Sequence, residues 1–226
     1  MTLRANARVA GYAFLVYIAV GLSALFLQRG ATGGENTAAM LASVAQHAGA
    51  LRLALLLDMV ACFCALVLAV TLYAITRDQD RDLAMLVAVF RVAEGVVGAV
   101  GLERSAARLW LGTTAHRPDP AATDALAAYL LKLHESPDVG ATFFAVGSTI
   151  FAWLLLRGRI VPAPLAWIGL AGSILAVVVL PLNLVGLAGS PLTDVMWLPL
   201  LVFEVWLALR FILKGAAVPS GAAARS

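Results

Sequence analysis

Six long apolar runs dominate the sequence and restrict the folds that it can adopt. They cover residues 9–27, 50–75, 83–106, 139–156, 163–187 and 192–213. About 20 apolar residues in a helix are needed to cross the core of a bilayer. Because lipid offers no partners to exposed backbone groups, each run is expected to be helical. We therefore predict an all-α, polytopic membrane protein in which six transmembrane helices form a single domain over residues 1–226.

Composition and charge agree with this fold class. Hydrophobic residues make up 62% of the chain and charged residues 13%, against about 45–50% and about 25% in soluble domains. The formal net charge of +3 is small, and the arginines flank the apolar runs. This pattern suits membrane lipids with anionic headgroups as partners, and it does not favour nucleic acid.

The basic residues also predict the orientation of the chain. With the N-terminus inside, nine of the 16 Lys and Arg residues fall in inner segments and six in outer segments, and Arg91 lies within the membrane. The short inner segments around Arg77 and Arg157 follow the positive-inside pattern. We predict a multi-pass protein of a bacterial inner membrane, with both termini in the cytoplasm.

The connection between the third and fourth runs contains an amphipathic helix, predicted over about residues 120–135. Asp119 can cap this helix, and Pro120 suits its first position. One apolar face is formed at helical spacing by Leu126, Tyr129, Leu130 and Leu133. We expect the helix to lie along the outer surface of the bundle as a cap.

Five polar side chains within the apolar runs are candidates for a functional site. They are Asp58, Arg91, Glu94, Asn183 and Glu204, and they come from four predicted spans. A charged side chain at the centre of a membrane helix costs about 2.5–3.5 kcal/mol, so these groups are expected to face the interior of the bundle. Arg91 and Glu94 share one helix face, which continues through Gly98 and Gly101 and lets a neighbouring helix approach closely.

Two interpretations of this polar set stay open. Arg91 and Glu94 form either a clamp that locks helix packing or a site that handles a ligand or a proton. Asp58 can join them, and the resulting excess of negative charge is most readily removed by protonating one carboxyl group. Glu204 has no obvious basic partner, so we expect a single hydrogen-bonded carboxylic acid there. His134 is either a solvated residue at the end of the cap helix or a group presented to the carboxylates.

Four segments of the sequence resemble a known family. They are ARVAGYAFLVYIAVGL, LAVTLYAITR, LAMLVAVFRVAEG and GRIVPAPLAWIGLAG. Together they are similar to an uncharacterised family of bacterial six-helix integral membrane proteins that is catalogued only as a domain of unknown function, of the DUF4386 type. The resemblance covers Arg8 to about Gly172, is most specific at Arg91, Glu94 and His134, and assigns nothing to Glu204. Because the family has no assigned activity, the resemblance implies the fold and no mechanism.

Three functions agree with these patterns. The first is binding of a lipid or a small amphipathic ligand, with a polar end formed by Arg91, Glu94, Asp58, Asn183 and Glu204. The alternative is an intramembrane acid-base enzyme for an isoprenoid-like or lipid substrate, with Glu94 or Asp58 as proton donor and His134 as base. In the third, the ion pair is structural and the protein is a partner subunit. No cofactor motif is present and the scattered histidines do not favour a metal site, so neither group is expected; a homo-oligomer stays open.

Overall fold

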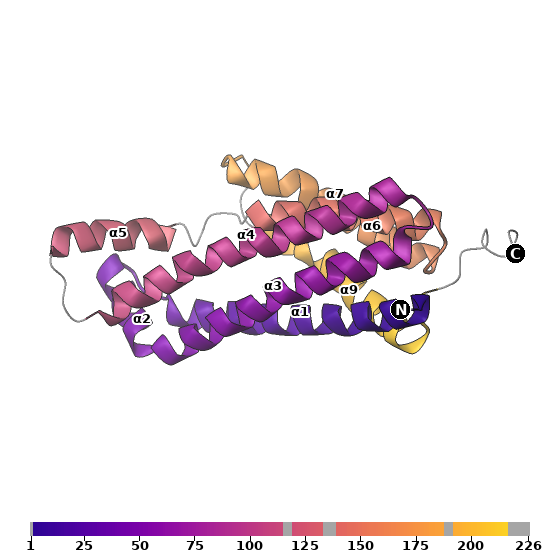
Figure 1. Ribbon diagram of the computed structural model, residues 1–226. Coiled ribbons are helices and arrows are strands. Elements are labelled where there is room, and N and C mark those ends of the chain that lie inside the picture. Colours follow the sequence, from indigo (N-terminus) through magenta and orange to yellow (C-terminus); the bar gives the residue numbers. More distant parts are fainter. Residues whose placement is uncertain (1, 115–118, 133–138, 188–191, 217–226) are drawn as a thin grey trace, which may run out of the picture. The chain divides into compact units, whose positions relative to one another are not determined.

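The structure is a computed structural model, and it describes residues 2–114, 119–132, 139–187 and 192–216. Helices account for most of these residues, and no strand occurs among them (Figure 1). The helices are α1 (Leu3–Ala31), α2 (Thr37–Gln46), α3 (Ala48–Thr76), α4 (Arg81–Thr113), α5 (Pro120–Lys132), α6 (Val139–Arg157), α7 (Ala163–Leu184), α8 (Leu192–Val195) and α9 (Trp197–Leu213). The predicted all-α fold class is confirmed for this part of the chain.

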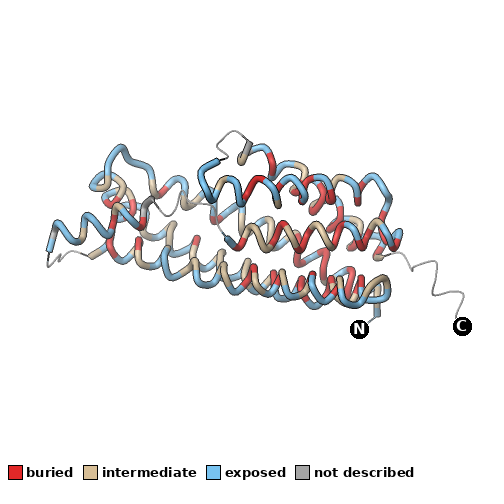
Figure 2. Tube along the Cα trace, turned by 90° about the horizontal axis from the view of Figure 1, so that it is seen from above, coloured by how far each residue is buried: buried red, intermediate tan, exposed pale blue. Residues whose placement is uncertain are grey.

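Five of the helices are long and apolar enough to cross a membrane, namely α1, α3, α4, α6 and α7. They correspond to the first five predicted spans. In the most apolar window, 28% of the residues are buried in α1, α3 and α4, and 50% in α6 and α7. In Figure 2, exposed residues (pale blue) recur along the length of the helices. Since so much apolar surface is not covered by protein, the chain is a multi-pass, membrane-embedded helical protein.

The predicted sixth span, residues 192–213, is not one continuous helix. It is divided at Met196 into α8 and α9, and α9 has 17 residues. The third residue of α9 is Pro199. A proline ring lacks the backbone N–H and collides with the helical carbonyl four residues earlier, which here belongs to Val195, the last residue of α8. The predicted sixth span is therefore present as two helical segments, and Pro199 explains their division.

The chain forms two compact units, each built from segments that are separated in sequence. Unit 1 contains Met1–Ile18, Phe63–Gly95 and Pro137–Ser226, and unit 2 contains Ala19–Cys62 and Val96–Ser136. In unit 1, α6 packs on α7 and α7 packs on α9. A glycine permits the second contact, because a Cβ atom at Gly169 would meet the ring of Phe203 at 2.5 Å.

Unit 2 contains a short helix that the run-length pattern did not predict. Helix α2 begins after Asn36, whose side-chain oxygen accepts a hydrogen bond from the Ala39 N–H at 2.8 Å. With 10 residues, α2 is too short to cross a bilayer. It packs on α5 and makes the connection between α1 and α3 partly helical.

Helix α5 is the predicted amphipathic helix, with a different buried face. Its cap is as predicted, since the Asp119 carboxylate accepts a hydrogen bond from the Ala121 N–H at 3.0 Å. The residues that α5 buries are Ala127 and Leu130, whereas Leu126 and Tyr129 are exposed. The predicted face counted only large side chains, but the small Ala127 lies where α5 joins the core that contains Leu41 of α2 and Leu111 of α4. Leu133 lies outside the described residues.

Candidate functional site

A buried arginine is the centre of a polar cluster in unit 1. Arg91 on α4 is 1% exposed, and it is the largest fully buried side chain among the described residues. Its Nη1 donates to Glu94 Oε2 at 3.1 Å, one helical turn away. Its Nη2 donates to Glu204 Oε1 on α9 at 3.3 Å and to Ser148 Oγ on α6 at 3.4 Å. The predicted ion pair of Arg91 and Glu94 is thus present, and Arg91 links three helices.

The surroundings of Glu204 differ from those that we predicted. We expected it to lack a basic partner, but it forms an ion pair with Arg91. The prediction was wrong because the two residues are 113 positions apart in the sequence, and only the packing of α4 and α9 in one unit reveals their contact.

Two further side chains of this cluster were missed by sequence reasoning. Tyr17 Oη on α1 donates to Glu94 Oε1 at 2.6 Å, and Ser148 accepts from Arg91. Tyrosine and serine are common near membrane helix ends and in helix contacts, so neither stands out in the sequence. A hydrogen bond from a hydroxyl to a charged carboxylate is short and strong, so Tyr17 fixes the orientation of Glu94.

Aromatic rings complete the surroundings of the guanidinium group. The Cζ atom of Arg91 lies 4.7 Å from the centre of the Phe144 ring and 5.6 Å from that of Phe14. These distances are within the range of a cation-π interaction. The cluster holds one guanidinium and two carboxyl groups, and Glu94 and Glu204 are 7% and 5% exposed. Its charged groups are therefore paired with one another and closed off by protein.

Unit 2 contains the other predicted carboxylate and a second buried arginine. Asp58 on α3 accepts a hydrogen bond at 2.7 Å from Gln28 Nε2 on α1. Arg108 on α4 interacts electrostatically with Asp58. Its Nη2 donates to Ser105 Oγ at 2.7 Å, whereas its Nη1 is buried and has no hydrogen-bond partner in the structure.

The burial of Arg108 was not predicted from the sequence. The third apolar run was expected to end near residue 106, but α4 continues to Thr113 and keeps Arg108 inside the fold, at 9% exposure. The helical spacing of Arg104, Ser105 and Arg108 was the available signal.

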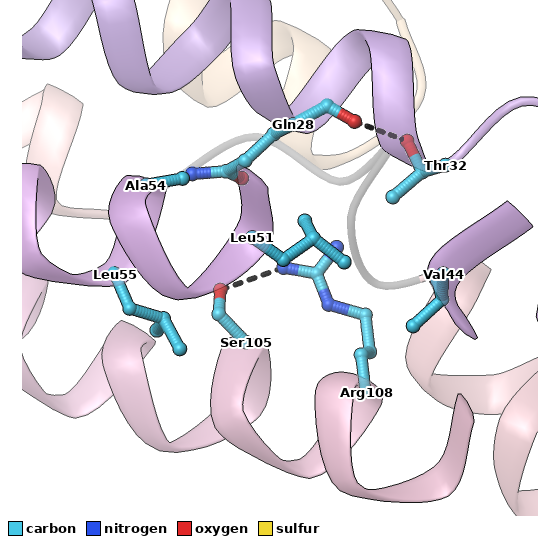
Figure 3. A pocket seen from close by; sticks show the side chains of 8 residues that line it. All are labelled: Gln28, Thr32, Val44, Leu51, Ala54, Leu55, Ser105 and Arg108. Atoms are coloured by element: carbon cyan, nitrogen blue, oxygen red, sulfur yellow. Dashed lines mark hydrogen bonds between the residues drawn. The ribbon is translucent and has the colours of Figure 1, made fainter. Parts of the chain in front are cut away.

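The Arg108 side chain lines a pocket in unit 2 (Figure 3). The polar lining comes from Gln28 of α1, from Thr32 directly after α1, and from Ser105 and Arg108 of α4. The remaining wall is apolar and includes Leu51 and Leu55 of α3. The enclosed part has room for about one water molecule. In Figure 3 the guanidinium points from α4 into this space.

The other predicted site residues do not join either group by a described contact. Asn183 lies in the last turn of α7 and is half-buried, and its backbone carbonyl accepts from the Gly186 N–H at 2.9 Å. His134 lies outside the described residues, so its role as a base stays a prediction. Among the described residues, no three His, Cys, Asp or Glu side chains are grouped so that they could hold a metal ion.

Comparison with known proteins identifies the family of the chain. A family model for a domain of unknown function, DUF4386, matches residues 9–215. The chain belongs to the DUF4386 family. No curated protein and no solved structure matches it. The match covers most of the chain, including both buried arginines, and it agrees with a membrane protein of unknown function.

Proposed function

We propose that this DUF4386 protein is a six-span protein of the bacterial inner membrane that binds a lipid or a small amphipathic molecule. The pocket of unit 2 carries this proposal. It combines an apolar wall from α3 with polar groups from α1 and α4. Ligand sites typically have this composition, because the apolar wall supplies affinity and a few polar groups fix orientation.

The sixth span in this proposal consists of α8 and α9 together. Residues 192–213 in helical form measure about 33 Å, close to the roughly 30 Å thickness of a bilayer core. An even number of spans puts both termini on one side of the membrane. The excess of Lys and Arg in the segments that would then be inside assigns that side to the cytoplasm.

The ligand is proposed to enter the pocket with only a small part of its polar end. The enclosed space is of the size of one water molecule, so it accepts a single oxygen-bearing group. Apolar residues beside it on α3 face outward, including Leu53 and Leu56. An amphipathic molecule could thus place its head at the pocket and its chain along the outer surface of α3.

This function is tested by blocking the pocket. In Leu55→Trp an indole ring replaces a leucine side chain of the pocket wall, whereas Leu56→Trp makes the same change at an exposed neighbour. Each protein is purified in mild detergent, its monodispersity is checked by size exclusion, and bound lipids are identified by native mass spectrometry. We expect a defined lipid on the wild type and on Leu56→Trp that is lost from Leu55→Trp. Equal retention in all three proteins, or no retained molecule, would contradict the proposal.

A second candidate function is that of a partner subunit whose Arg91 cluster is a structural clamp. The pairing of Arg91 with both Glu94 and Glu204 favours it. The same mass spectrometry distinguishes the two. A ligand lost in Glu204→Gln but kept in Leu55→Trp would move the binding site to the Arg91 cluster.

A further inference from the structure

We infer that the ligand of the unit 2 pocket has an anionic head, which binds through a phosphate or carboxylate oxygen to Nη1 of Arg108; this inference rests on the function proposed above. Arg108 is more than nine-tenths buried and points into the pocket. Of its terminal nitrogens, Nη2 is used by Ser105, and Nη1 has no partner within the structure. A buried donor without a partner is costly, so a bound acceptor would stabilise it.

The charges around the pocket favour an acceptor that carries one negative charge. Two charged groups influence Arg108, the exposed Arg104 and the half-buried Asp58. Together with Arg108 they give this part of unit 2 two cations and one anion, an excess of one positive charge. A head with one net negative charge balances this excess, whereas a zwitterionic head, whose phosphodiester is accompanied by a cation, does not.

The neighbouring polar groups restrict the ligand further. The Asp58 carboxylate accepts from Gln28 through Oδ2, and Arg108 Nη1 makes no hydrogen bond to any described residue. The Thr32 hydroxyl donates to the backbone carbonyl of Gln28 at 2.9 Å. Arg108 Nη1 is therefore a charged donor of the pocket lining that is left without an acceptor. A guanidinium binds phosphate and carboxylate oxygens by short, charge-assisted hydrogen bonds.

The ligand chemistry has two sources, the headgroup of a membrane lipid and free phosphate, and one experiment separates them. Delipidated protein in detergent is titrated with phosphatidylglycerol and with phosphatidylcholine of the same acyl chains, and binding is followed by native mass spectrometry. We expect about tenfold tighter binding of phosphatidylglycerol, as a charge-assisted hydrogen bond supplies. Inorganic phosphate is then added. Displacement of the lipid assigns the pocket to free phosphate, and retention assigns it to the lipid headgroup; both results support the anionic site.

Three variants make the inference falsifiable. Arg108→Gln is expected to lower phosphatidylglycerol binding to the level of phosphatidylcholine. Arg52→Gln removes the same charge from an exposed position on α3 and should keep the preference. Asp58→Asn can still accept from Gln28, removes the opposing charge and should strengthen the preference, which covers the case that Arg108→Gln does not fold.

The outcomes separate this inference from the function on which it rests. If the wild type binds both lipids equally and Leu55→Trp loses both, the pocket binds amphipathic molecules, and the inference that the ligand has an anionic head is wrong. If the wild type binds neither lipid, both proposals fail. A preference for phosphatidylglycerol that survives in Arg108→Gln while Asp58→Asn has no effect would also overturn the role of Arg108.

Discussion

Arg91 in unit 1 and Arg108 in unit 2 are both buried arginines of α4, but their surroundings differ. Arg91 donates to Glu94, Glu204 and Ser148, which lie on three helices. Arg108 donates to Ser105 on its own helix, and its Nη1 has no partner. Among the described residues, Arg91 leaves only its Nε without a partner and both of its terminal nitrogens are held by the protein, whereas Arg108 retains a terminal donor at the pocket for a group from outside the chain.

This difference assigns different roles to two residues that look alike in sequence. A buried ion pair is costly to break, because the remaining charge loses its partner. A buried arginine with an unused donor adds little to stability, because part of its desolvation is not compensated. We therefore expect substitutions around Arg91 to change the stability of the fold, and substitutions around Arg108 to change binding.

The largest effect is expected for Arg91→Met, which leaves Glu94 and Glu204 buried without a cation. Removing one partner of a buried pair costs about 3–5 kcal/mol. The loss is measured as the temperature at which half of the detergent-solubilised protein remains monodisperse in size exclusion. Arg157→Met is the control, because it breaks an exposed ion pair with Asp80 worth about 0–1 kcal/mol. If the two variants lose the same stability, the Arg91 cluster is not a clamp.

The next effect ranks the two carboxylates of the cluster. Glu94 receives hydrogen bonds from Tyr17 and from Arg91, and Glu204 receives one from Arg91. Glu94→Gln is expected to cost about 2–3 kcal/mol, since hydrogen bonds to a charged group are lost. Glu204→Gln should cost less than about 1 kcal/mol, because Glu204 accepts from Arg91 alone and a neutral pair with Arg91 remains in either variant. Thermal unfolding of both variants checks the order, and the reverse order would contradict the assigned geometry.

Much of the fold was predictable because a bilayer imposes a length and a composition on each helix. The first five apolar runs became long helices, and Asp119 and Pro120 began α5 as predicted. Gly98 also lies at a close approach, since a Cβ atom there would meet Cys62 Sγ at 3.3 Å. These features depend on the local sequence alone.

The candidate sites were less predictable because they depend on contacts between distant residues. The pair of Arg91 and Glu94 is local and was found, whereas the contact of Arg91 with Glu204 joins residues 113 positions apart. The burial of Arg108 was not predicted because a charged residue at the end of an apolar run normally ends the buried part of a helix. The spacing of Arg104, Ser105 and Arg108 agrees with a longer helix, but it does not reveal the pocket beside Arg108.

A smaller effect is expected for the hydroxyl group that orients Glu94. Tyr17→Phe removes its hydrogen bond to Glu94 and nothing else. The expected loss in the free energy of unfolding is about 1.5–2 kcal/mol, the lower part of the range for one hydrogen bond to a charged group. Tyr12→Phe is the matched control, because Tyr12 is exposed on the same helix and should show no change. If Tyr17→Phe left the stability unchanged, the orientation of the Glu94 carboxylate would not depend on this hydrogen bond.

The smallest effect on stability, and the sharpest contrast with Arg91, is expected for Arg108→Leu. The substitution removes a buried guanidinium whose Nη1 has no partner. Asp58 keeps its hydrogen bond from Gln28 in this variant, so we expect the free energy of unfolding to fall by no more than about 1 kcal/mol. Phosphatidylglycerol binding should fall in the same preparation, whereas Arg52→Leu should keep it. A fall in stability as large as that of Arg91→Met would show that Arg108 holds the fold together, and the two arginines would then have the same role.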